Sequence, residues 1–227
     1  NALEKENFNT FSYDYFSKDI TDPLTGLTSY ETIQKAVETA KEFISGFGLS
    51  DSETRNLLIC GNTGVGKTFL TNCIAHELIN AGHGIVYLSA NELLKILEDY
   101  KFRRNDTDDF ETVYERYTSV YDCDLLIIDE IDAFPYADNE VLEAFFTRAV
   151  KGRYIMLSAT PSERILKLFS NKESRVLKLN KRFHGHPLPV PQIIVGKGFI
   201  KYIILLLEVN KFIKQSKPTF IFAPTIK

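Results

Sequence analysis

The feature that most constrains this chain is a glycine-rich stretch at residues 61–68, Gly-Asn-Thr-Gly-Val-Gly-Lys-Thr. It fits the pattern G-x-x-x-x-G-K-[ST], whose glycines let the backbone turn so that its N–H groups face an anionic phosphate. Apolar or small residues occupy positions 57–60 before it, and apolar residues recur at helical spacing from Phe69 to Ile79 after it. A buried strand, a glycine loop and a helix are the context that this pattern requires. The sequence therefore predicts a phosphate-binding loop of a nucleoside triphosphatase.

The residues of this loop have distinct expected roles. Lys67 is expected to reach the β- and γ-phosphates and to take part in catalysis, and Thr68 is expected to ligate Mg²⁺. The predicted cofactors are therefore ATP and Mg²⁺. The residues expected to surround the nucleotide are Gly61, Asn62, Thr63, Gly64, Val65, Gly66, Lys67, Thr68 and Phe69.

A second signal lies at residues 124–130, Asp-Leu-Leu-Ile-Ile-Asp-Glu. A near-continuous apolar run is typical of a strand buried on both faces of a parallel sheet, and such sheets place ligand sites at their carboxyl ends. Asp129 is expected to be the Mg²⁺ partner, directly or through water, and Glu130 the general base for the attacking water. Such a strand alone is commonplace. Its pairing with the upstream loop makes it a strong indication of an ATPase.

Hydroxyl groups follow another expected strand, residues 154–157. In one interpretation Ser158, Ala159 and Thr160, together with Asp132, sense the γ-phosphate and couple hydrolysis to movement. In the other, the hydroxyls cap the next helix, with Pro161 at its first position. The sequence leaves both interpretations open.

Strand and helix signals alternate along the chain, which predicts a three-layer α/β sandwich with a parallel sheet, a P-loop fold of RecA/AAA+ type. We divide it into an N-terminal arm and helix (1–50), a P-loop ATPase core (51–195) and the truncated start of a second RecA-like lobe (196–227). That truncation is expected because the chain ends on a bare strand, 218–223. Besides those above, the expected strands are 85–88 and 175–179, and the expected helices are 28–44, 91–100, 111–120, 140–150, 162–169 and 200–213.

Composition narrows the class of protein. A hydrophobic content of 44% and a charged content of 25% are typical of a soluble globular protein. The net charge of −3 gives no global basic signature for nucleic acid, and the basic residues of 101–104 fit either a solvated loop or a contact with a DNA backbone. Three widely spaced cysteines in apolar segments indicate reduced core thiols, so we expect a cytoplasmic protein without a zinc site or a membrane span.

The first 27 residues carry five aromatic side chains among polar residues. Their simplest role is to pack an N-terminal arm onto the domain. The alternative is that part of the arm lies over the adenine of the nucleotide. These residues are Phe8, Phe11, Tyr13, Tyr15 and Phe16.

Residues 6–130 resemble the DnaC/IstB-like ATPases of the AAA+ class, which include helicase loaders. The resemblance is carried by Phe-Asn-Thr-Phe-Ser-Tyr at 8–13, the strand, loop and helix of 56–75, Val-Tyr-Leu-Ser-Ala at 86–90 and Cys-Asp-Leu-Leu-Ile-Ile-Asp at 123–129. It implies an oligomeric ATPase whose partners are a replicative helicase and DNA.

Residues 124–227 look instead like the ComFA-type DNA translocases of competence, relatives of superfamily 2 helicases. The segments that carry this resemblance are 129–136, 157–163, 182–191 and 217–224. It implies that residues 158–160 couple ATP to single-stranded DNA and that the lobe with the arginine finger is missing. Candidates for a replacement arginine are Arg164, Arg175 and Arg182.

The two resemblances meet at the strand 124–129, which suggests a hybrid of two lineages. Together they imply an ATPase of DNA metabolism, either a helicase loader or a DNA translocase lobe. A nucleotide-gated binding module with little turnover is the alternative outside these enzyme classes.

Overall fold

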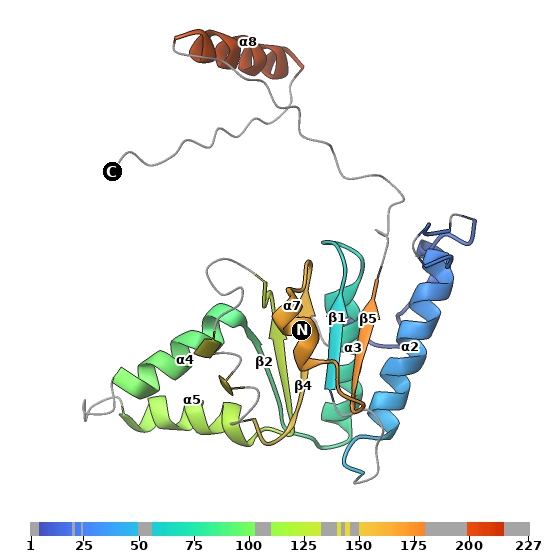
Figure 1. Ribbon diagram of the computed structural model, residues 1–227, viewed down its shortest axis with the longest axis vertical. Coiled ribbons are helices and arrows are strands. Elements are labelled where there is room, and N and C mark those ends of the chain that lie inside the picture. Colours follow the sequence, from blue (N-terminus) through green and yellow to red (C-terminus); the bar gives the residue numbers. More distant parts are fainter. Residues whose placement is uncertain are drawn as a thin grey trace. The chain divides into compact units, whose positions relative to one another are not determined.

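A parallel sheet of five strands forms the centre of the first of the two units into which the chain divides, Asn1–His186 and Pro187–Lys227 (Figure 1). Its strands are β1 (Asn56–Cys60), β2 (Ile85–Ser89), β3 (Leu125–Asp129), β4 (Arg153–Ser158) and β5 (Ser174–Lys178). They lie in the order β2-β3-β4-β1-β5, and every pair is parallel. The computed structural model describes residues 5–19, 21–23, 25–49, 56–102, 110–132, 140–141, 144–145, 150–179 and 199–215.

Side chains that alternate along the strands separate two hydrophobic layers. In β3, Leu125 and Ile127 join the layer under α2 (Ser29–Ser45) and α3 (Lys67–Asn80). Leu126 and Ile128 join the layer with α4 (Ala90–Phe102) and α5 (Phe110–Asp122). All four side chains are fully buried, and burial of each contributes roughly 1.5–3 kcal/mol. The predicted three-layer sandwich, and the strand buried on both faces, are confirmed.

The ends of α2 follow from local sequence. Thr28 is the N-cap, and its hydroxyl accepts from the backbone N–H of Glu31 at 3.1 Å while the Glu31 carboxylate accepts from the Thr28 backbone at 2.8 Å. This reciprocal pair satisfies two N–H groups that would otherwise lack a partner. The helix ends at Gly46, as its glycine predicts.

Another helix start differs from the prediction. Helix α7 is Glu163–Leu168, and its N-cap is Ser162, whose hydroxyl accepts from the N–H of Ile165 at 3.4 Å. Pro161 therefore precedes the cap instead of opening the helix. The hydroxyls of residues 158–160 are not the cap of this helix, because Ser162 already accepts the N–H that a cap must satisfy.

The second unit contains helix α8 (Ile200–Lys214), which agrees with the helix expected at 200–213. The strand expected at 218–223 lies outside the described residues. So does most of the helix expected at 140–150, of which residues 140–141 and 144–145 are described and helical. None of the helices in the described part of the chain is long and apolar enough to cross a membrane.

Arg153, the first residue of β4, connects the sheet to the C-terminal end of α2. Its side chain donates to the carbonyl oxygens of Gly46 at 2.8 Å and Leu49 at 3.3 Å. The guanidinium also lies over the rings of Phe43 and Phe47, at 5.8 and 4.8 Å from their centroids. A charge that is only 9% exposed is thus compensated by carbonyl dipoles and aromatic faces.

Replacing Arg153 with alanine is expected to lower the free energy of unfolding by about 2–3 kcal/mol, because two carbonyls lose a charged donor and two rings lose a cation. Urea denaturation followed by circular dichroism measures this loss. Arg164→Ala is the control, since Arg164 pairs with Glu140 across 3.5 Å at the surface, where such pairs contribute about 1 kcal/mol or less. Equal losses in the two variants would contradict the assignment.

Candidate functional site

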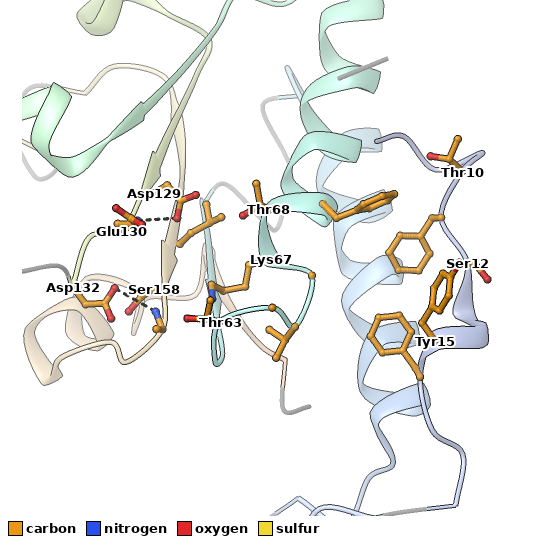
Figure 2. A pocket seen from close by; sticks show the side chains of 18 residues that line it. Thr10, Ser12, Tyr15, Thr63, Lys67, Thr68, Asp129, Glu130, Asp132 and Ser158 are labelled. Atoms are coloured by element: carbon orange, nitrogen blue, oxygen red, sulfur yellow. Dashed lines mark hydrogen bonds between the residues drawn. The ribbon is translucent and has the colours of Figure 1, made fainter. Parts of the chain in front are cut away.

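A cavity of about 660 Å³ opens beside the glycine loop, at the carboxyl ends of the central strands (Figure 2). It contains twelve of the fifteen site residues predicted above; Gly61, Asn62 and Thr160 are outside its lining. Residues from the N-terminal arm also line it. The lining residues are Thr10, Phe11, Ser12, Tyr15, Phe16, Thr63, Gly64, Val65, Gly66, Lys67, Thr68, Phe69, Asp129, Glu130, Asp132, Leu157, Ser158 and Ala159.

The order of the strands brings these segments together. Because β4 lies between β1 and β3, its last residue, Ser158, lies between the start of the glycine loop and Asp129. Cys60 pairs with Ser158 in register, and the Gly61 N–H donates to the Ser158 carbonyl at 3.1 Å. Segments distant in sequence thus form one edge of the sheet, where parallel sheets bind ligands.

Glycine is required at two positions of the loop. At Gly61, with φ of 146°, an added Cβ would lie 2.1 Å from the carbonyl oxygen of Leu179. At Gly66, with φ of 96°, the backbone is left-handed as it enters α3. A side chain would clash at Gly61 and would strain the backbone at Gly66. The prediction that these glycines permit the loop conformation is confirmed by their dihedral angles.

Lys67 folds back over the loop that precedes it. Its Nζ donates to the carbonyl oxygens of Gly61 at 2.6 Å and Asn62 at 3.2 Å. Burial lowers the pKa of the Lys67 ammonium, and the carboxylates of Asp129 and Asp132 oppose that shift. Within the described part of the chain, the direct partners of the ammonium are neutral carbonyls, so an anionic group at the mouth of the loop would be a stronger partner.

Both carboxylate oxygens of Asp129 accept hydrogen bonds. Oδ1 accepts from the backbone N–H of Glu130 at 2.8 Å, and Oδ2 accepts from the hydroxyl of Tyr87 at 2.8 Å. Burial and the neighbouring Asp129 carboxylate raise the pKa of Tyr87, which keeps its hydroxyl a donor. Sequence reasoning missed Tyr87, because nothing in the strand 85–88 shows that this side chain reaches the end of β3.

Glu130 has an unusual backbone conformation. Its φ is 57°, and among the described residues it is the non-glycine residue with a positive φ. For a residue with a side chain this conformation costs about 1–2 kcal/mol, and such strain concentrates at functional sites. Figure 2 shows the Asp129 and Glu130 side chains on the same side of the cavity, across from Lys67 and Thr68.

Asp132 binds the segment that follows β4. Its carboxylate accepts from the backbone N–H groups of Ala159 at 3.3 Å and Thr160 at 2.8 Å, and from the Thr160 hydroxyl at 2.9 Å. Burial alone would raise the pKa of Asp132, but these hydrogen bonds together hold it below its usual range. Within the predicted coupling group, Asp132 is thus connected to Ala159 and Thr160.

Ser158 differs from its neighbours in this group. Its side chain is 1% exposed and lines the cavity, and its Oγ has no hydrogen-bond partner among the described residues. A buried hydroxyl without a partner costs about 1–3 kcal/mol. Such a group is suited to bind a ligand that enters the cavity.

Replacing Asp132 with asparagine is expected to destabilise the protein by about 1 kcal/mol at neutral pH, because two N–H groups and a hydroxyl lose their charged acceptor. The pKa of Asp132 is lowered in the folded protein, so its contribution is present above the unfolded-state pKa of about 4 and is lost as the pH falls through the folded value. Urea unfolding at pH 7, 5 and 3.5 should show the two proteins converging below about pH 4. Asp19→Asn, on the exposed arm, is the control, and a difference independent of pH would contradict this account.

The aromatic arm reaches the cavity from the other side. Phe11 packs edge-on against Phe69, with ring centroids 5.6 Å apart, and stacks with Phe16 at 6.2 Å. Phe11 and Phe16 also pack against the core layer under α2 and α3, so the expectation that the arm packs on the domain is confirmed. The same rings form an apolar wall beside the loop.

The donors that would hold a metal ion are oxygen atoms. The Thr68 hydroxyl and the Asp129 carboxylate line the same cavity, and hard oxygen ligands suit Mg²⁺. The described residues contain no cluster of three or more His, Cys, Asp or Glu side chains able to form a metal site by themselves. One or two protein ligands fit Mg²⁺, which usually completes its shell with waters and substrate phosphates.

The cavity lacks an arginine among the described residues that line it. Arg164 pairs with Glu140, and Arg175 donates to the carbonyl oxygens of Lys172 at 2.8 Å and Ser174 at 3.2 Å. Arg182 lies outside the described residues. The two described candidates for an arginine finger are thus engaged elsewhere.

A parallel α/β sheet with a glycine loop and two carboxylates at its edge defines a P-loop NTPase. More specifically, the family described as IstB-like ATP-binding protein matches residues 30–173, and the chain belongs to that family. Its match extends through the acidic strand and past residue 130, where we expected this resemblance to end.

Two curated relatives agree with this class. The competence protein ComFA of Streptococcus pneumoniae is 32% identical over 197 residues, covering 75% of this chain and 45% of that protein. The replicative helicase loader DnaC of Escherichia coli is 25% identical over 137 residues, covering 57% of this chain and 53% of that protein. The chain thus spans about half the length of each. The ComFA match covers 75% of the chain, which is more than residues 124–227 alone provide. That resemblance therefore also extends into the first half of the chain.

One solved structure has the same fold. AMPPCP-bound DnaA from Aquifex aeolicus superimposes with a TM-score of 0.52 at 20% identity, covering 76% of this chain and 49% of that one. At this identity the likeness concerns the fold alone. It agrees with the parallel P-loop sheet described above.

Proposed function

We propose that this protein binds Mg-ATP in the 660 Å³ cavity and hydrolyses it in the service of DNA metabolism. The observation that carries this proposal is that one cavity contains Lys67, Thr68, Asp129 and Glu130, which come from two distant segments of the chain. Each has the chemistry that phosphoryl transfer to water requires.

In this proposal the loop N–H groups and Lys67 hold the β- and γ-phosphates, so the ammonium exchanges its carbonyl partners for phosphate oxygens. Thr68 and Asp129 hold Mg²⁺, which neutralises developing charge on the phosphates. Glu130 orients the attacking water and accepts its proton. The Ser158 hydroxyl, which is buried and has no partner in the described part of the chain, donates to the γ-phosphate or to that water.

The nucleobase is assigned to the aromatic side of the cavity. Phe11, Tyr15 and Phe16 line it together with Phe69, and flat aromatic surfaces accommodate a purine by stacking. The presence of these arm residues in the lining of the cavity supports the expectation that part of the arm lies over the adenine.

Turnover by the isolated chain is proposed to be slow. An arginine finger contributes ~10³–10⁵ in rate to P-loop enzymes, and the described lining of the cavity lacks one. We assign that arginine to a neighbouring copy or to a partner, which makes assembly part of the activity.

The proposed role in the cell is based on what the names of the relatives say of those proteins. A helicase loader that acts with a replicative helicase and DNA is the leading role, because DnaC is a helicase loader and the family match covers most of the chain. The second proposed role is that of a DNA-translocase lobe like part of a competence protein, and it is based on the ComFA match. A hybrid of two lineages stays a prediction, and the family match runs across the expected junction.

Calorimetry with ATP and Mg²⁺, followed by phosphate release with and without single-stranded DNA, tests the proposal. Binding with slow release is expected, accelerated when DNA or a replicative helicase is added. Nucleotide-dependent capture of a replicative helicase would favour the loader, and DNA-stimulated directional movement would favour the translocase. Bound ATP that stays unhydrolysed in every mixture would indicate a nucleotide-gated binding module, and absence of binding would refute the proposal.

A further inference from the structure

Tyr87 belongs to the edge strand of the sheet, and its hydroxyl reaches the carboxyl end of the neighbouring strand β3. It lies on β2, in register with Ile127 of the neighbouring β3, two residues before Asp129. Its neighbour on the same face of the strand, Ile85, packs against the layer that contains α3. Strand alternation therefore directs Tyr87 toward the helix that begins with Lys67 and Thr68.

The Tyr87 hydroxyl binds a carboxylate that lines the cavity. It donates to Asp129 Oδ2 at 2.8 Å. A phenol has a single proton to donate, and this hydrogen bond commits it to the Asp129 carboxylate.

The other oxygen of Asp129 is also held. Oδ1 accepts from the Glu130 N–H at 2.8 Å. A backbone donor on one oxygen and a tyrosine donor on the other fix the rotation of the carboxylate. One edge of each oxygen remains available for a further ligand, since a carboxylate accepts about four hydrogen bonds.

We propose that Tyr87 is a positioning residue that holds the Asp129 carboxylate in the orientation that receives the metal ion of a metal–nucleotide complex. This inference rests on the proposed function. Partners that hydrogen-bond to metal ligands orient them, and loss of such a partner typically costs 10–100-fold in metal affinity or activity. The simpler role is that the ring only fills space between the sheet and α3, and a readout specific for the metal separates the two.

The test is Tyr87→Phe, which keeps the ring and removes the hydroxyl. The affinity for AMPPCP is measured by calorimetry in EDTA and in saturating Mg²⁺, and the ratio of the two dissociation constants is the metal-dependent gain. We expect this gain to fall by about 10-fold while the affinity in EDTA changes less than about 2-fold. Tyr117→Phe is the matched control. Tyr117 of α5 stacks on Tyr100 of α4, with ring centroids 3.8 Å apart, and neither residue lines the cavity.

A second measurement separates positioning from loss of structure. Tyr87→Phe is also made in an Asp129→Asn background, where the positioned carboxylate is gone. A positioning role predicts that Tyr87→Phe has little further effect on the metal-dependent gain in this background, whereas the effect of a packing defect would persist.

An unchanged gain in Tyr87→Phe, or a loss that is fully additive with Asp129→Asn, would overturn the inference. These outcomes differ from failure of the proposed function, in which the unaltered protein would not bind AMPPCP at all.

Discussion

Replacing Lys67 with alanine is expected to weaken binding of Mg-ATP by roughly 10- to 100-fold. The ammonium is partly buried at the mouth of the loop, where its partners among the described residues are the neutral carbonyls of Gly61 and Asn62. A hydrogen bond to a charged group contributes about 1.5–3 kcal/mol, and 1.4 kcal/mol corresponds to a factor of ten in affinity. Calorimetry measures the binding.

Hydrolysis should fall further than binding in the same variant. Charge accumulates on the transferred group in the transition state, and removing one donor aimed at it costs ~10²–10³ in rate. Lys172→Ala, which removes an exposed lysine outside the cavity, is the control and should match the unaltered protein. Unchanged ATP affinity in Lys67→Ala, with the fold intact by circular dichroism, would refute the phosphate role of the loop.

Replacing Glu130 with glutamine is expected to separate binding from turnover. The substitution keeps the size of the side chain but removes the group that accepts a proton from water. General base catalysis contributes about 10²–10⁴ in rate, so steady-state hydrolysis should fall by that factor. The dissociation constant for Mg-ATP should change by less than about 3-fold, because an interaction made only in the transition state does not affect ground-state binding.

Phosphate release under saturating ATP gives the rate, and calorimetry gives the affinity. Glu98→Gln, an exposed carboxylate of α4, is the control. If Glu130→Gln hydrolysed ATP as fast as the unaltered protein, the base would have to be another group, and Asp132 would be the first to examine because it lines the same cavity.

Where side chains repeat with the period of one element, the sequence predicted structure well. The run Leu125–Ile128 is apolar at every position, which only a strand covered on both faces accommodates, and all four side chains are fully buried. Helix α2 was predicted at 28–44, close to its observed bounds, because apolar residues recur there at helical spacing after residues able to cap a helix. The helix at 162–169 was placed with the wrong first residue, because Pro161 and Ser162 are both good start signals and only the backbone distinguishes them.

The site was predicted as far as its motifs extend. Lys67, Thr68, Asp129 and Glu130 each belong to a pattern whose chemistry is local. Tyr87 belongs to no pattern, and its contact with Asp129 spans 42 positions of the chain. The alternative in which the hydroxyls of residues 158–160 cap the next helix was decided only by the backbone, where Ser162 is the N-cap, and their sensing role stays a prediction.

The sequence by itself determined the phosphate loop, its following helix and the acidic strand, because glycine freedom and apolar periodicity act over a few neighbouring residues. Only the tertiary structure decided how these segments meet. The insertion of β4 between β1 and β3 places the buried Ser158 hydroxyl between the loop and Asp129, and the edge strand brings Tyr87 to that carboxylate. Strand order depends on which surfaces bury best against one another across the whole sheet, and no local pattern in the chain encodes that choice.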